Sequence, residues 1–151
     1  MTENTARKKP KKVFLEGPIS PQFVADSISK HSSKTDIGAH NIFMGQVRAD
    51  VKGGKEVTAI DYSSYREMAE KEFHEIRESA FIQFDLNCMH IYHSLGLVNA
   101  GEISLFIFVS SKHRDECYKA SRFLVEEIKA KVPIFGKEIF TDNSHSWKEN
   151  K

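Results

Sequence analysis

The stretch ISLFIFVSSKHRDECYKASRFLVEEIKAKVP, residues 103–133, decides the fold of this chain. Its first part, Ile103 to Val109, is rich in β-branched and aromatic residues, which predicts a buried central strand. From Asp115 to Lys131 the apolar and small residues recur at helical spacing, and Pro133 ends the helix that this spacing predicts. A strand and a helix therefore follow each other directly, with only a short basic turn between them.

Further elements extend from this stretch on both sides. Ser20 followed by Pro21 predicts a helix start, with Ser20 at the N-cap and Pro21 at the first helical position. The other predicted helices cover 67–84 and 115–131, and the predicted strands cover 13–15, 40–47, 56–62, 86–93, 103–109 and 137–140. Glycines at 53–54 predict a hairpin between strands 40–47 and 56–62, and 96–101 is a predicted turn region. This order predicts an α+β sandwich, with helices against a largely antiparallel sheet.

Length and composition indicate one domain. The chain has 151 residues, of which 40% are hydrophobic and 28% charged, so we expect a single globular domain over residues 13–151. The longest apolar run, Leu105 to Val109, is far shorter than the ~20 residues of a membrane helix, so no membrane partner is expected. Two cysteines, Cys88 and Cys117, make no disulfide framework and favour a reducing, cytoplasmic setting.

Residues 1–12 differ from the rest of the chain. They hold five basic residues, one acid and a proline without an apolar pattern, which predicts a disordered basic tail. The whole chain has a net charge of +1, so the domain itself is net negative and must build any anion site locally. The tail alone would suggest a small RNA-binding protein. The net-negative domain lacks the aromatic and basic sheet of RNA-recognition modules, so no nucleic-acid partner is expected.

The usual sequence signals for metals and cofactors are missing. The seven histidines form neither an HExxH motif nor a Cys/His cluster, and His90 and His93 should point to opposite faces of one strand. There is no GxGxxG after a strand, no Walker loop and no GxSxG elbow. We therefore expect no metal site.

The basic turn is the first candidate for chemistry. Lys112, His113 and Arg114 stand where a helix begins, and backbone N–H groups at helix starts favour anions. Asp115 and Glu116 follow and partly compensate this charge. The segment predicts an anion site, unless Arg114 pairs with a surface carboxylate and His113 is half-buried.

Two further segments carry cations near possible pockets. Lysines at a helix C-terminus ordinarily satisfy the helix dipole, but the apolar bend 132–135 can bring Lys129 and Lys137 to the wall of one pocket. A desolvated lysine beside other cations has a lowered pKa and can act as acid, base or nucleophile. Arg48, which follows 45–47 at a strand end, can bind an oxyanion or a phosphate, or else is an exposed arginine of a hairpin.

Together these segments resemble one family, the large catalytic subunit of molybdopterin synthase. The resemblance runs from about Val13 to Trp147. It rests on a series of motifs in one order along the chain: Phe43-Met44-Gly45-Gln46-Val47-Arg48; Tyr62 and Tyr65 followed by Met68-Ala69; His93-Ser94-Leu95-Gly96 with Gly101-Glu102; Ser110-Ser111-Lys112-His113-Arg114; and Lys129 through Pro133-Ile134-Phe135 to Lys137-Glu138.

The resemblance implies a fold, a reaction and partners. The fold would be an α/β hammerhead-type sandwich with an additional antiparallel β subdomain. The enzyme would be a sulfurtransferase that converts cyclic pyranopterin monophosphate to molybdopterin, using the thiocarboxylate at the C-terminal Gly-Gly of a small ubiquitin-like subunit. Two large subunits would form a homodimer with a small subunit at each end, giving a heterotetramer. No metal and no organic cofactor is implied.

The resemblance also implies site residues. Lys129 falls on the family's catalytic lysine, and we expect Lys137 to assist it. Arg48, His113 and Arg114 would bind the phosphate. The full expected substrate-binding set is Gln46, Val47, Arg48, His113, Arg114, Lys129, Gly136, Lys137 and Glu138.

Two positions depart from the family pattern. The family's second catalytic lysine aligns with Gly136, and Lys137 would point the other way unless the backbone freedom of Gly136 redirects it. The usual His-Arg-x-Gly reads His93-Ser94-Leu95-Gly96 here, which removes a cation. An active sulfurtransferase is the leading interpretation. The alternative is a catalytically impaired homologue that serves as a dimeric binding subunit for the small sulfur carrier.

Overall fold

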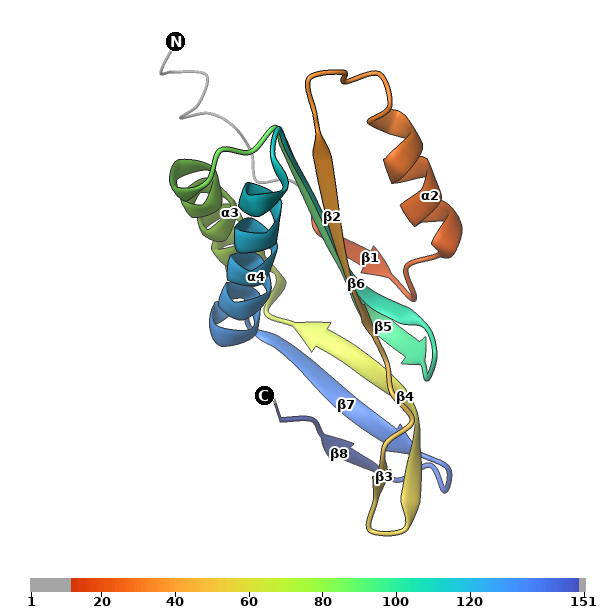
Figure 1. Ribbon diagram of the computed structural model, residues 1–151. Coiled ribbons are helices and arrows are strands. Elements are labelled where there is room, and N and C mark those ends of the chain that lie inside the picture. The colour runs from red at the N-terminus through yellow and green to blue at the C-terminus, as the bar shows by residue number, and fades with distance from the viewer. Residues whose placement is uncertain (1–11, 150–151) are drawn as a thin grey trace.

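The computed structural model describes residues 12–149 (Figure 1). The elements follow in the order β1 (Phe14–Glu16), α2 (Pro21–Lys30), β2 (Ala39–Gln46), β3 (Val51–Lys52), β4 (Lys55–Ser64), α3 (Arg66–Gln83), β5 (Cys88–Asn99), β6 (Ile103–Ser111), α4 (Arg114–Lys131), β7 (Ile134–Phe140) and β8 (His145–Trp147). The basic tail expected over residues 1–12 lies, apart from Lys12, outside the described residues. No described helix is long and apolar enough to cross a membrane.

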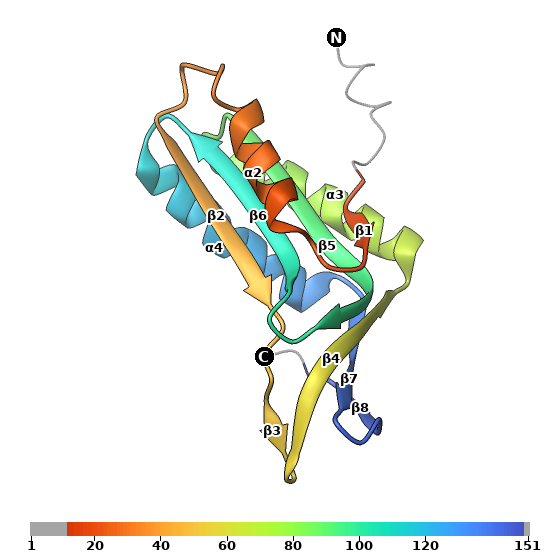
Figure 2. The ribbon, with the colours of Figure 1, turned by 90° about the vertical axis from the view of Figure 1, so that its right-hand side faces the viewer.

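The main sheet is built around β6. This strand pairs antiparallel with β2 on one side and β5 on the other, and β1 runs parallel to β5. After its first residue every residue of β6 is buried, which confirms the predicted central strand. Helix α2 covers one face of this sheet, while α3 and α4 lie together on the other (Figures 1 and 2).

The alternation along β6 explains why both faces need helices. Leu105, Ile107 and Val109 belong to the core that includes α3 and α4, whereas Phe106 and Phe108 belong to the smaller core under α2. Successive side chains of a strand point to opposite faces, so an apolar strand without polar interruptions must be covered on both. The sequence pattern thus determines a sandwich of three layers.

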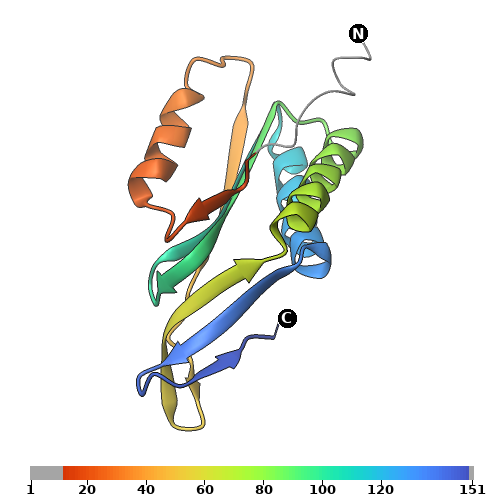
Figure 3. The ribbon, with the colours of Figure 1, turned by 180° about the vertical axis from the view of Figure 1, so that it is seen from behind.

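A second antiparallel sheet extends from the far half of β5. Residues 96–99 of β5 pair with β4, which pairs in turn with β7, and β7 pairs with β8 (Figure 3). Gly96 stands where β5 passes from one sheet to the other, and its φ of +85° is a conformation that only glycine adopts without strain. This arrangement confirms the α+β hammerhead-type sandwich with an added antiparallel β subdomain.

The predicted hairpin between strands 40–47 and 56–62 is wrong. β2 instead pairs along its whole length with β6, from Ala39 opposite Ser111 to Gly45 opposite Leu105. A strand buried on both faces needs hydrogen-bonding neighbours on both edges, and β2 supplies one of them. Gly53 and Gly54 do form a hairpin turn, but it joins β4 to the short strand β3.

Other predicted boundaries need smaller corrections. The turn expected over 96–101 is shorter, because β5 continues to Asn99. The last predicted strand, 137–140, begins earlier, at Ile134, and the short strand β8 follows it. The predicted helix start is confirmed, since the Ser20 hydroxyl accepts a hydrogen bond of 3.1 Å from the Phe23 N–H and Pro21 is the first helical residue.

Candidate functional site

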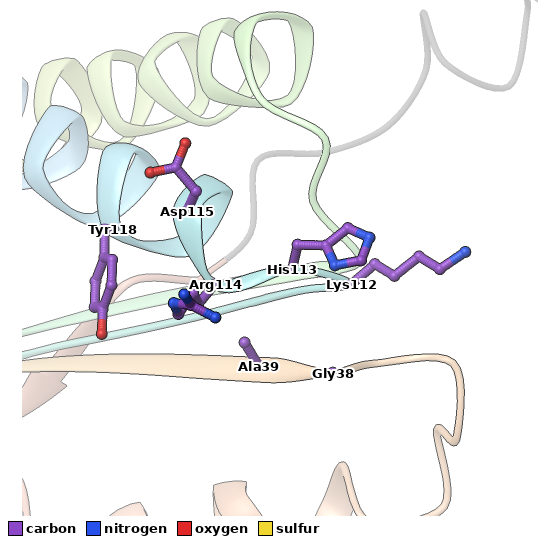
Figure 4. A pocket seen from close by; sticks show the side chains of 7 residues that line it. All are labelled: Gly38, Ala39, Lys112, His113, Arg114, Asp115 and Tyr118. Atoms are coloured by element: carbon purple, nitrogen blue, oxygen red, sulfur yellow. The ribbon is translucent and has the colours of Figure 1, made fainter.

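The basic turn forms one wall of a pocket of about 550 Å³ at the start of α4 (Figure 4). The start of β2 forms the facing wall. Gly38 lies so close to the backbone of Lys112 that a Cβ there would meet the Lys112 carbonyl oxygen. The lining residues are Gly38, Ala39, Lys112, His113, Arg114, Asp115 and Tyr118.

The electrostatics of this pocket suit an anion. His113 is the N-cap of α4 but makes no side-chain capping bond, so the first N–H groups of the helix have no such partner. The two acids of the first turn are engaged, because Asp115 pairs with Lys119 at 3.0 Å and Glu116 accepts a hydrogen bond from the Asp85 N–H. Their negative charges are therefore partly offset within the protein.

The basic turn itself is open to solvent. His113 is exposed rather than half-buried, and among residues 12–149 no carboxylate pairs with Arg114. The structure therefore does not show the alternative expectation, in which Arg114 pairs with a surface carboxylate. Both side chains are available to a ligand.

Lys129 lies at the other end of α4, in its last turn, and its side chain is exposed. Its charge acts on His93, a fully buried residue of β5 whose ring packs edge-on against Tyr62 at 5.1 Å. Burial, and to a lesser extent Lys129, lowers the pKa of His93 to about 4, although the hydrogen bond to the Ser94 carbonyl opposes this. His93 is therefore neutral at pH 7, and the ring adds no positive charge beside Lys129.

The strand that carries Gly136 and Lys137 is regular. Gly136 lies opposite Tyr62 on β4, and Lys137 lies opposite Asp61, so the two residues project from opposite faces of the sheet. Gly136 does not have a positive φ. The backbone freedom expected of Gly136 thus does not redirect Lys137 to the face that carries Tyr62.

The space at Gly136 is already filled. A Cβ at this position would lie 2.9 Å from Cγ2 of Ile60, which is closer than side-chain carbons approach each other. A lysine here, as in the family pattern, would therefore require Ile60 to move.

Another lysine reaches this face from an element that the sequence did not link to the site. Lys52, on β3, donates a hydrogen bond of 2.7 Å to Glu138, whose side chain is only 2% exposed. Glu138 lies two residues from Gly136 and on the same face of β7. This bond raises the pKa of Lys52, so its ammonium stays charged. Its contact depends on the fold, because the two partners are 86 residues apart.

The three residues of the segment Gln46–Arg48 differ in how far they are exposed to a ligand. Gln46 and Arg48 are exposed, and Arg48 pairs with Asp50 at 3.3 Å. Val47 is 2% exposed, and its N–H and carbonyl bond to Glu102 and Gly101. The side chain of Val47 therefore packs in the core of the β subdomain with Ile60 and Val98 rather than facing solvent.

The predicted site residues fall into two groups at opposite ends of the domain. Lys129 follows Arg114 by fifteen residues of continuous helix, which places their Cα atoms about 22 Å apart. Ala39, at the beginning of β2, lines the pocket, the strand runs about 23 Å from there to Gln46, and Arg48 lies beyond that end. Arg48 thus does not share one pocket with His113 and Arg114 inside a single chain.

Two exposed aromatic side chains pack together next to the starts of α3 and β7. The rings of Tyr65 and Phe135 lie edge-on at 5.3 Å, and Tyr65 is 65% exposed. Met68, one turn into α3, is also exposed. Ser94, the position that departs from the family's His-Arg-x-Gly pattern, is fully buried.

Solved structures first define the class of this fold. The X-ray crystal structure of molybdopterin synthase from Staphylococcus aureus matches with a TM-score of 0.79 and 29% identity, covering 91% of this chain and 96% of that one. A protein–protein complex of subunits 1 and 2 of the molybdopterin-converting factor from Helicobacter pylori 26695 has a TM-score of 0.77 over 92% and 90% of the two chains. At 17% identity this second match shows the fold alone.

The sequence then defines the family. The family model described as "MoaE protein" matches residues 16–131, so this chain belongs to the MoaE protein family. The molybdopterin synthase catalytic subunit of Homo sapiens is 36% identical over 83% of this chain and 66% of its own length. That of Pyrococcus abyssi is 37% identical over 78% of each chain. That of Aspergillus fumigatus is 37% identical over 81% of this chain, but the match spans only 64% of the relative.

Proposed function

We propose that this chain is the catalytic subunit of a molybdopterin synthase and acts as a sulfurtransferase. Sulfur would pass from the thiocarboxylated C-terminus of a small ubiquitin-like subunit to cyclic pyranopterin monophosphate. The observation that carries the proposal is the pocket at the start of α4, with Lys112, Arg114 and the ring of His113 and its helix start without a side-chain cap. Kinship with molybdopterin synthase catalytic subunits supports the reaction class.

The pocket would hold the phosphate of the substrate. The guanidinium of Arg114 can donate two parallel hydrogen bonds to phosphate oxygens, while Lys112 adds a point charge and His113 a ring N–H. All three are exposed at the pocket, so no structural rearrangement is needed for an anion to reach them.

Lys129 would move protons during sulfur transfer. Opening of the cyclic phosphate and hydrolysis of the thioester to the partner both need a group that donates and accepts protons. Because Lys129 is exposed here, the partner's tail would supply the cover that excludes water from it. The exposed Tyr65 and Phe135 rings, next to the starts of α3 and β7, offer an apolar surface on which a narrow Gly-Gly tail can lie.

The second amine of the site is Lys52 rather than Lys137. Lys52 places an ammonium on the face of β7 that carries Gly136 and Glu138, whereas Lys137 projects from the other face. Since Glu138 keeps Lys52 charged, its role would be to stabilise negative charge, not to act as a base.

Two copies of the chain would complete each site. The phosphate pocket and Lys129 are separated by the length of α4, and a two-fold axis can bring the pocket of one copy to the Lys129 end of the other. In the expected homodimer, each site would thus combine the phosphate pocket of one copy with Lys129 of the other. A small subunit at each end would complete a heterotetramer.

Complementation between inactive variants tests the shared site. In single-turnover sulfur transfer with the thiocarboxylated small subunit, at a low concentration of the cyclic monophosphate, Lys129→Ala alone would be inactive and Arg114→Ala alone would be strongly impaired by its weaker substrate binding. Co-expressed chains form mixed two-fold dimers with one intact site, so activity should return to roughly a quarter of the wild-type value. The matched control co-expresses Lys129→Ala with the Lys129→Ala/Arg114→Ala double variant, which leaves every site without Lys129.

The outcomes separate the proposals. No recovery of activity in the mixed dimers would show that each chain carries its own site. A wild-type chain that binds the small subunit but forms no product would instead be the impaired binding homologue.

A further inference from the structure

Three potential metal ligands converge on the face of the sheet opposite Lys129. His31 is the C-cap residue of α2, and Cys88 and His90 lie at the start of β5. One ligand atom from each lies within 4.8 Å of the others. His31 and Cys88 are buried and His90 is partly buried. The histidine and cysteine spacing in the sequence predicts no such cluster, because His31 is brought in by the docking of α2.

The two imidazoles are arranged as metal ligands are. Nδ1 of His31 lies 2.7 Å from the carbonyl oxygen of Ser27, which can only accept, so Nδ1 carries the proton. The lone pair of His31 is therefore on Nε2, which lies 3.0 Å from Nε2 of His90. Two nitrogen ligands on a tetrahedral ion, with bonds of about 2.0–2.1 Å, lie about 3.3 Å apart. A backbone carbonyl that fixes the tautomer is also the common outer partner of a ligating histidine.

Cys88 brings the third ligand with its own outer partner. Nζ of Lys34 donates a hydrogen bond of 3.2 Å to Sγ of Cys88, which holds the sulfur in place beside the two rings. The ring of Phe108 packs against both His31 and His90 and forms an apolar wall beside them. Two imidazoles and a thiolate suit Zn²⁺, with a water as the fourth ligand.

We propose that His31, Cys88 and His90 form a Zn²⁺ site that fastens the end of α2 to β5. The apolar core under α2 is smaller than the core under α3 and α4. Coordination of a metal ion by residues of both α2 and β5 would therefore stabilise the packing of α2 on the sheet. The site lies on the other face of the sheet from Lys129 and is independent of the sulfur-transfer proposal.

Metal binding to the purified full chain tests this assignment. After chelator treatment, equilibrium dialysis against Zn²⁺ should return one ion per chain, and Zn²⁺ should raise the melting temperature. Co²⁺ in place of Zn²⁺ should give the near-ultraviolet charge-transfer band of a thiolate ligand. Cys88→Ser should abolish this band and lower Zn²⁺ affinity at least about 100-fold, since loss of outer partners alone costs 10–100-fold.

Cys117→Ser is the matched control, because Cys117 is the other cysteine and is also buried but lies outside the cluster. It should keep the band and the affinity. His31→Gln is a second test that leaves the thiol in place, and it should keep the thiolate band while weakening binding. The assignment is overturned if the wild-type chain binds no Zn²⁺, or if Cys88→Ser and Cys117→Ser bind it equally well. The short distance between His31 and His90 is then an ordinary hydrogen bond.

Discussion

His93 should make the stability of this protein fall in mild acid. Its ring is fully buried between Phe14 and Tyr62, and burial, with a smaller effect of Lys129, lowers its pKa from 6.5 to about 4. In the unfolded chain the same imidazole has its ordinary pKa, so between pH 6.5 and 4 the unfolded state binds more protons than the folded state. Stability is then complete above pH 6.5 and is lost as the pH falls through this window.

The size of this loss follows from the shift. Each pKa unit corresponds to 1.36 kcal/mol, so the change from 6.5 to about 4 costs about 3 kcal/mol once the pH is below both values. Only His93 among the histidines has so large a shift in the described part of the chain.

The free energy of unfolding, measured by urea denaturation between pH 7 and 4, checks this reasoning. His93→Phe keeps a ring in the core but cannot titrate, so its loss of stability over this range should be smaller than the wild-type loss by about 3 kcal/mol. Carboxylates titrate in both proteins and cancel in the difference. His145→Gln, which changes an exposed histidine of β8, should follow the wild-type curve. Parallel wild-type and His93→Phe curves would refute the assigned pKa.

Three further outcomes are expected. Arg114→Ala should weaken binding of the cyclic monophosphate by about 1–3 kcal/mol in calorimetric titration, and unchanged affinity would place the phosphate elsewhere. Lys52→Ala should lower single-turnover sulfur transfer about 10²-fold while Lys137→Ala changes it little, and the reverse order would return Lys137 to the catalytic role. Gly136→Ala should lower the free energy of unfolding by about 1–3 kcal/mol because its Cβ meets Ile60, whereas a neutral effect in denaturation would show that β7 moves to admit it.

The spacing of apolar residues and the capping residues predicted most of the helices and strands, but they did not predict which strands pair. The helix starting at Pro21, the two long helices and the buried strand β6 all follow from spacing and from capping or terminating residues within a few positions. The partner of β2 could not be found in this way. Hydrogen bonds of a sheet join residues distant in sequence, so β2 pairs with β6 rather than with the next strand along the chain.

The site shows the same division. The sequence by itself grouped Lys112, His113 and Arg114 at a helix start, where the structure has a pocket that these residues line. It could not show that α4 holds Arg114 and Lys129 apart.

Nor could the sequence bring Lys52 to Glu138, or His31 to Cys88 and His90. These contacts arise when separate elements pack, and they depend on burial and strand register rather than on neighbouring residues. Composition and spacing thus determined which side chains the chain can offer, while tertiary packing decided which of them meet, because only the folded core sets distances between residues far apart in sequence.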